Sequence, residues 1–340
     1  MTLSAAASPL PLDRRRCLAL GAAALALGLR PAAASLPRED MIGEVTYLVT
    51  DGNETLLDIA RVRGLGVPEI SAVNPGVDPW VPAAETLLTL PTAHLLPDAP
   101  HTGIVINIPE MRLFWFPKGA PVETYPIGIG REEFTTPIGS TKIVRKQKDP
   151  VWRPTADARR TNPDLPEMVP AGPDNPMGEY AMYLGWPTYA IHGTNRPYAV
   201  GRRVSRGCIR MYPEAVESLF QRIPVGTKVT TVFQPVKVGW HQGELWIEVQ
   251  PDLSQIDELE VSQTMSVVPA PDARDLVLKK AGPDADRIDW TAVDAELITR
   301  RGLPVQITRP RPPGSSSAVA DGAAPAPPPA ASAPGLDGIY

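Results

Sequence analysis

The sequence His192-Gly193-Thr194, followed by Ser205-Arg206-Gly207-Cys208-Ile209-Arg210, decides how the rest of the chain is interpreted. The chain has two cysteines, and the other one, Cys17, lies in a segment that we expect to be removed on export. A thiol is a nucleophile only as its thiolate, so Cys208 needs a base, and His192 is the candidate. The pair predicts a cysteine acyltransferase outside the cytoplasm. The alternative for Cys208 is a buried, inert thiol.

Length and composition set the outer limits of the prediction. A chain of 340 residues suggests about two or three domains. The 41 prolines and only 5 phenylalanines favour short strands and many loops. The net charge is −5 and neither sign forms a long run, so the sequence carries no signature of a nucleic-acid or anionic-membrane partner.

Residues 1–34 have the organisation of an export signal. Arg14-Arg15-Arg16 precedes an apolar stretch that runs to Leu29, and Ala32-Ala33-Ala34 supplies a cleavage site before Ser35. The paired arginines are similar to a twin-arginine signal. A retained membrane anchor is the weaker alternative, because the apolar stretch is short for a bilayer span. We therefore expect a periplasmic protein with no transmembrane span in the mature chain.

Residues 45–91 predict a small strand-helix-helix-strand module. Tyr47 and Val49 alternate as in a strand, Thr55-Leu56 opens a helix, and Asn74-Pro75 closes a second one. The pattern resembles the lysin motif, which implies binding to the glycan of peptidoglycan. One extra residue stands between Gly52 and Thr55 relative to that motif. The alternative is a packing domain that only positions the rest of the protein.

Residues 102–233 are predicted to be rich in β-strands, with one helix after Pro213. Prolines and glycines crowd residues 146–178, which predicts a long loop of the kind that covers a cleft. Many short strands and few helices indicate a mainly β, α+β fold with a sandwich-like or barrel-like domain.

This domain resembles the catalytic domain of bacterial L,D-transpeptidases of the periplasmic type. The resemblance rests on the His192-Gly193-Thr194 triplet, the Ser205–Arg210 motif, Thr136-Pro137-Ile138-Gly139 and Asn175-Pro176-Met177-Gly178. Arg206 departs from the family pattern, which more often has histidine there.

The resemblance, together with the chemistry of the residues, predicts a role for each residue of the motif. Cys208 is expected to attack a carbonyl and His192 to accept and return its proton. Backbone N–H groups at Arg206, Gly207 and Cys208 would stabilise the oxyanion, with Ser205 as a polar turn residue. The residues expected to contact substrate are Gly193, Thr194 and Arg210.

Charge and metal binding complete the predicted site. Five arginines and no acidic residue lie between Tyr180 and Pro213, which would favour the thiolate and attract a carboxylate. The alternative is a solvated basic loop. No histidine outside the motif has metal-ligand spacing with Cys208, so we expect neither a metal nor a cofactor.

By resemblance, the donor substrate is a tetrapeptide stem of peptidoglycan. Cys208 would take the acyl group of meso-diaminopimelate and release D-alanine. An amine would then resolve the thioester, forming a 3-3 crosslink with another stem or an attachment to the lysine of an outer-membrane lipoprotein. Two alternatives stay open, namely a non-catalytic peptidoglycan-binding scaffold and an L,D-carboxypeptidase that uses water.

The C-terminal part divides into two segments. Residues 235–309 form an accessory region, predicted to contain a hairpin over 236–250 and a helix over 284–301. Residues 310–340, rich in proline, alanine, serine and glycine, are predicted to be disordered.

Overall fold

The computed structural model describes residues 39–310. The predicted export signal 1–34 and the predicted tail, apart from Pro310, lie outside the described residues. Within residues 39–310, no helix is both long and apolar enough to cross a bilayer.

The first module forms from two strands and two helices in the predicted order. β2 (Thr46–Val49) pairs with β3 (Leu87–Leu90), and α1 (Leu56–Arg63) and α2 (Val67–Val73) lie between them in sequence. The Thr55 side chain accepts the Asp58 N–H and the Asp58 carboxylate accepts in return, so a capping box starts α1. Apolar side chains on both helices and β3 make its core: Leu56, Ile59, Ile70, Leu88 and Leu90.

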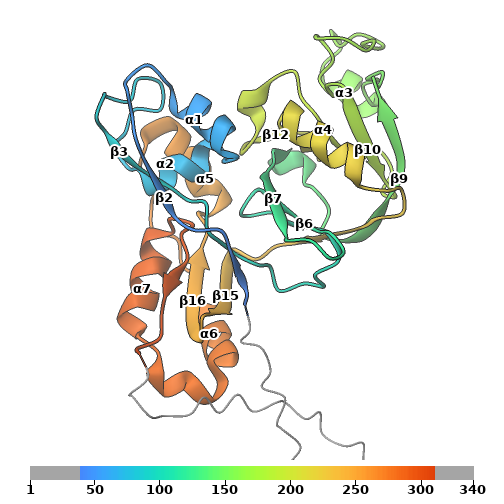
Figure 1. Cartoon of the computed structure of the whole chain (residues 1–340). Coiled ribbons are helices and arrows are strands. Elements are labelled where there is room, and N and C mark those ends of the chain that lie inside the picture. Colours follow the sequence, from blue (N-terminus) through green and yellow to red (C-terminus); the bar gives the residue numbers. More distant parts are fainter. Residues whose placement is uncertain (1–38, 311–340) are drawn as a thin grey trace, which may run out of the picture. The chain divides into compact units, whose positions relative to one another are not determined.

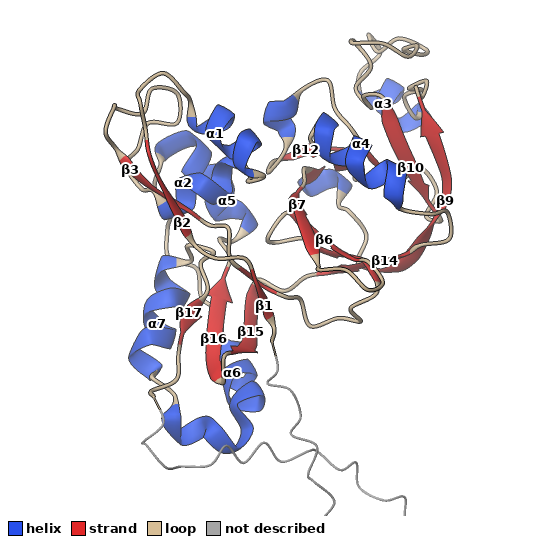
Figure 2. Ribbon diagram, in the orientation of Figure 1, coloured by secondary structure: helices blue, strands red, loops and turns tan. Residues whose placement is uncertain are grey.

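The largest sheet has eight strands in the order β13-β11-β10-β9-β14-β5-β6-β7, and it is curled (Figure 1, Figure 2). Its strands are β5 (Gly103–Asn107), β6 (Arg112–Phe116), β7 (Glu123–Pro126), β9 (Gly139–Lys148), β10 (Tyr180–Leu184), β11 (Ala190–His192), β13 (Ile209–Arg210) and β14 (Lys228–Val232). The sheet and its short helices confirm the mainly β, α+β prediction.

Two parallel pairings decide where the motif residues lie. β14 runs parallel to β5, and β11 runs parallel to β13. The register of the second pair sets Ile191 against Ile209 and His192 against Arg210. Cys208 directly precedes β13, so in this register it lies level with Ala190 of β11, two positions along that strand from His192.

Shorter elements surround this sheet edge. They are β8 (Ile129–Gly130) paired with β12 (Arg203–Ser205), the 3₁₀ turns η1 (Glu132–Phe134) and η2 (Pro197–Ala199), α3 (Ala156–Thr161) and α4 (Pro213–Arg222). Val216 and Leu219 of α4 pack on the sheet core with Ile191 and Ile209. The long loop predicted over 146–178 begins after Lys148, because β9 extends to that residue. The loop contains a short helix, α3.

The C-terminal region has its own sheet, β15 (Val236–His241), β16 (Glu244–Val249) and β17 (Val305–Gln306), with α6 (Ala273–Ala281) and α7 (Trp290–Thr299). α5 (Leu253–Ser262) lies apart from that sheet, and Ile256 joins the core of the large sheet. The single helix expected over 284–301 is wrong. Instead, a 3₁₀ segment, η3 (Gly282–Arg287), precedes α7. The Asp289 side chain caps α7 by accepting from the N–H groups of Thr291 and Ala292.

Two further strands, β1 (Met41–Ile42) and β4 (His94–Leu95), pair with each other. They join the small module to the C-terminal sheet, since the Lys237 ammonium of β15 donates to the Leu95 carbonyl at 2.6 Å. The divisions at 45–91, 102–233 and 235–309 stay predictions about independent domains.

Candidate active site

His192 ends strand β11 as a buried side chain with one fixed ring nitrogen. Its Nδ1 lies 2.6 Å from the carbonyl oxygen of Gly193. A carbonyl only accepts, so Nδ1 carries the hydrogen and Nε2 keeps its lone pair. Burial and then the charge of Arg210 lower the pKa of His192 to about 4, against the backbone hydrogen bonds with Gly193 and Met177. The imidazole is therefore neutral at physiological pH and can accept a proton.

Cys208 is half-buried and is a free thiol. Its S–H donates to the carbonyl oxygen of Thr188 at 3.4 Å. Burial raises the pKa of the Cys208 thiol, while a hydrogen bond with the Ala190 backbone and the charge of Arg210 act in the opposite direction. The resting thiol is thus neutral, because burial outweighs the nearby positive charge. The charge of Arg210 favours the thiolate, as expected of a nearby arginine, but its effect on the Cys208 pKa is smaller than that of burial.

The turn before Cys208 is organised by Ser205. Its hydroxyl donates to the Cys208 carbonyl at 2.6 Å and accepts the Gly207 N–H at 3.0 Å. The Gly207 N–H is therefore occupied within the turn, which differs from its expected role in the oxyanion site. The N–H groups of Arg206 and Cys208 stay as the candidate donors.

Gly207 is at a position that only glycine fits. Its φ is +99°, and a Cβ there would stand 2.5 Å from Cε1 of Tyr189. Its carbonyl accepts from the Thr136 hydroxyl at 2.9 Å, which ties the Thr136-Pro137 motif to the nucleophile turn.

The Asn175–Gly178 motif supports the backbone around His192. The Asn175 side chain donates to the Pro150 carbonyl at 2.7 Å and closes the base of the long loop. A Cβ at Gly178 would stand 2.9 Å from the backbone nitrogen of Thr194, so the two segments pack backbone to backbone. Thr194 uses its hydroxyl to accept the Arg196 N–H at 3.0 Å. Gly193 and Thr194 therefore fix the backbone that follows His192 in this conformation.

Comparison with known proteins identifies the family. Residues 101–231 match the family model YkuD, described as the L,D-transpeptidase catalytic domain. The chain is 40% identical over 282 residues to "Probable L,D-transpeptidase ErfK/SrfK" of Salmonella typhimurium, covering 80% of this chain and 89% of that one. The chain belongs to the L,D-transpeptidase family.

Another relative and a solved structure match different shares of this L,D-transpeptidase. "Probable L,D-transpeptidase YbiS" of Escherichia coli K12 is 40% identical over 267 residues, which is 76% of this chain and 85% of that protein. Among solved structures, L,D-transpeptidase 3 from Mycobacterium tuberculosis is 21% identical with a TM-score of 0.30, covering 45% of this chain and 73% of that one.

Three of the five arginines between Tyr180 and Pro213 of this L,D-transpeptidase are paired away from the thiol. Arg202 lies 2.8 Å from Glu260 and Arg203 lies 3.3 Å from Asp257, both on α5. Arg206 pairs with Asp157 of α3, and its guanidinium lies 3.6 Å from the centre of the Phe134 ring. The residue in place of the usual histidine thus connects the nucleophile turn to the long loop.

Arg210 is the arginine whose charge acts on both Cys208 and His192. Its Nε is buried and has no hydrogen-bond partner among the residues described. Burial lowers the pKa of Arg210, although the group stays a cation.

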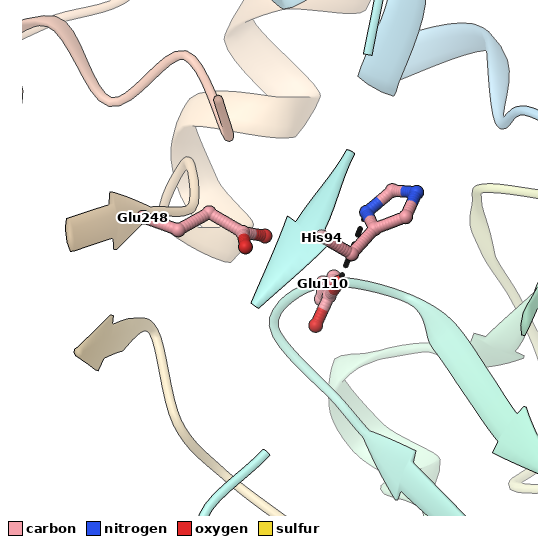
Figure 3. Close-up of side chains that lie close together, drawn as sticks. All are labelled: His94, Glu110 and Glu248. Atoms are coloured by element: carbon pink, nitrogen blue, oxygen red, sulfur yellow. Dashed lines mark ion pairs between the residues drawn. The ribbon is translucent and has the colours of Figure 1, made fainter. Parts of the chain in front are cut away.

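One group of side chains in the described residues could in principle hold a metal ion, namely His94, Glu110 and Glu248. Figure 3 shows Nδ1 of His94 joined to Glu110, at 3.5 Å, with Glu248 beside them. The Lys237 ammonium lies 2.8 Å from Glu110 and 2.9 Å from Glu248, so it already supplies positive charge between the two carboxylates.

The charges of this cluster follow from its contacts. Although burial acts to raise it, the ammonium and His94 lower the pKa of Glu110 to about 2. Burial raises the pKa of Glu248 to about 8, against the attraction of Lys237. The cluster is a buried ion-pair joint between β4, the β5–β6 turn and the C-terminal sheet. Sequence reasoning missed it because its members are far apart along the chain.

Proposed function

We propose that this L,D-transpeptidase acts on peptidoglycan in the periplasm, with Cys208 as nucleophile and His192 as proton acceptor and donor. The observation that carries the proposal is the neutral imidazole of His192, whose ring is held by the Gly193 carbonyl. Its strand, β11, pairs with β13, the strand that follows Cys208. Export, through the twin-arginine route, is supported by Arg14-Arg15-Arg16 and the apolar segment behind it.

The proposed acylation step balances through one proton. The thiol proton passes to Nε2 of His192 as Sγ bonds to the acyl carbon of meso-diaminopimelate. The oxyanion accepts from the Cys208 N–H, and collapse breaks the C–N bond to D-alanine, whose amine takes the proton from His192. Arg210 would bind a substrate carboxylate.

The second step reverses these roles with a new nucleophile. An acceptor amine attacks the thioester and its proton passes to His192. Collapse then breaks the C–S bond, and the Cys208 thiolate takes that proton back from His192. The amine is a second stem, which gives a 3-3 crosslink, or a lysine of an outer-membrane lipoprotein. Residues 45–91 would bring the enzyme to the glycan.

The test is to incubate a purified tetrapeptide muropeptide with the enzyme, with and without a second stem, and to follow the products by liquid chromatography and mass spectrometry. Dimers support transfer, trimmed tripeptides alone support the L,D-carboxypeptidase alternative, and unchanged substrate supports the scaffold alternative. A carbapenem, whose strained carbonyl mimics an acyl donor, should add its mass at Cys208. Unchanged transfer by Cys208→Ala would overturn the proposal.

A further inference from the structure

The small module contacts the nucleophile segment on the side that precedes Cys208. Gly66, at the start of α2, faces Gly201, and a Cβ on Gly66 would stand 3.1 Å from the Gly201 Cα. A Cβ on Gly201 would in turn lie 2.9 Å from the Gly66 Cα and 3.1 Å from Cδ of Pro68. The two backbones therefore touch without intervening side chains, directly before β12 and the Ser205 turn.

The same helical hairpin contacts the segment that follows Cys208. The Tyr212 hydroxyl donates to the Leu65 carbonyl at 3.0 Å, and Tyr212 is only 3% exposed. Nearer the solvent, Arg61 of α1 donates two hydrogen bonds of 2.9 Å to the Glu214 carboxylate of α4. The α1–α2 hairpin thus contacts both arms of the loop that carries the nucleophile.

A third contact fixes the hairpin to the large sheet. The Arg112 guanidinium of β6 is 1% exposed and lies 2.6 Å from the Glu69 carboxylate of α2. Glu69 also accepts the Gly66 N–H at 2.9 Å. Glu69 therefore both anchors the hairpin to the sheet and holds Gly66 against Gly201. Because the two backbones are already in contact, a displacement of the hairpin displaces the Cys208 loop directly.

We propose that the α1–α2 hairpin is a positioning element of the transfer site. Gly66 holds one arm of the Cys208 loop at Gly201, and the Leu65 carbonyl holds the other arm at Tyr212, in the reactive geometry. The consequence is a coupling between the module and the thiol, since any ligand that moves α1 and α2 moves both arms. The inference rests on the proposed role of Cys208 as nucleophile. It assigns to residues 61–69 a part in the reaction rather than in delivery alone.

The test uses the full-length exported chain with Gly66→Ser and Tyr212→Phe. Serine is a favourable N-cap, so Gly66→Ser keeps the start of α2 while adding a Cβ between the hairpin and Gly201. Thr55→Ser is the matched control, because it keeps a capping hydroxyl on α1 of the same module and does not contact the loop. Melting curves establish that each variant is folded at the assay temperature.

Two readouts separate positioning from folding. The first is the rate of carbapenem acylation, which we expect to fall about fivefold or more in Gly66→Ser, since sub-ångström to ångström displacements of reacting groups cost rate steeply. The second is the pH profile of Cys208 alkylation by iodoacetamide. Its midpoint should move down, because a loosened loop exposes the thiol and removes the burial that raises its pKa.

Each outcome decides something. Parental rates and a parental alkylation profile in both folded variants would overturn the positioning role. If Gly66→Ser does not fold, Tyr212→Phe, which removes one oxygen, carries the test alone. If the parent chain is not acylated by the carbapenem, the proposed function fails, and the alkylation profile still reports whether the hairpin controls the thiol.

Discussion

The Nδ1 atom of His192 donates to the carbonyl oxygen of Gly193, its own neighbour in the chain, at 2.6 Å. The group that orients the His192 ring is thus a backbone carbonyl, which the fold itself holds in place. A carboxylate in this position would stabilise the imidazolium, whereas a neutral carbonyl does so less. The arrangement produces a base that stays uncharged over a wide pH range.

The first prediction concerns the acid limit of the reaction. Because burial lowers the pKa of His192 to about 4 from 6.5, the imidazole stays deprotonated until the pH falls towards 4. The rate of Cys208 acylation by a carbapenem should therefore be maintained at pH 5 to 6 and lost near pH 4. The measurement is intact-protein mass against time across this range, with circular dichroism to verify folding. An acid limb centred near 6.5 would contradict it.

The second prediction concerns the Ser205 hydroxyl, which accepts from Gly207 and donates to Cys208. Ser205→Ala leaves a buried N–H and a carbonyl without their partner, and should lower the free energy of unfolding by about 1–3 kcal/mol. Urea unfolding measures the loss. Ser140→Ala is the control, since that hydroxyl makes one long contact of 3.4 Å with Thr230. Equal stabilities of the two variants would be incompatible with this role.

The third prediction concerns the pair of Arg206 and Asp157. Asp157→Asn should release α3 from the nucleophile turn while changing global stability by about 1 kcal/mol or less, because the pair is partly exposed. Hydrogen–deuterium exchange should speed up in residues 156–161. Asp157 also pairs with Arg160 within α3, and Asp164→Asn, after α3 in the same long loop, removes a charge that takes part in neither pair. Unchanged exchange in Asp157→Asn would show that α3 is held by other contacts.

The fourth prediction concerns Lys237, whose ammonium lies between Glu110 and Glu248. Lys237→Met leaves the buried, ionised Glu110 without its ammonium partner and should cost about 3–5 kcal/mol at neutral pH. The stability deficit of the variant should narrow as the pH falls below the unfolded pKa of Glu110. There the parent loses the stability of the ionised Glu110, while Glu110 of the variant becomes neutral. Denaturant unfolding at two pH values tests both statements.

The control for that experiment is Lys280→Met. Its ammonium pairs at 3.4 Å with Asp98, whose side chain is largely exposed, so a small effect at both pH values is expected. A small effect of Lys237→Met at neutral pH would mean that Glu110 is already neutral in the folded protein.

Local patterns made much of the fold predictable. Alternation at Tyr47 and Val49, the cap at Thr55 and the strand ending at His192 are each readable within a few residues, and the structure has elements there. The helix expected over 284–301 failed for an equally local reason, because the Asp289 cap starts a new helix within an otherwise helical pattern.

The electrostatics of the site could not be predicted in the same way. The arginine-rich sequence around Cys208 indicated a stabilised thiolate, but the partners of Arg202, Arg203 and Arg206 lie on α5 and α3, far away in the chain. Burial, which dominates the pKa of both Cys208 and His192, depends on the assembled fold. The residue types of the site could be found from sequence, whereas their charge states required the three-dimensional contacts.

Strand β14 follows all the other strands of the large sheet in sequence, yet it lies between β9 and β5. One half of the sheet carries His192 and leads to Cys208, and the other half contains β5, β6 and β7. Until residues 228–232 have left the ribosome, no strand joins these two halves. A chain interrupted before Lys228 would present two open sheet edges, which are templates for aggregation. The active site and the completed sheet should therefore be acquired late and together, and truncated chains should be cleared by proteases instead of persisting as partly active fragments.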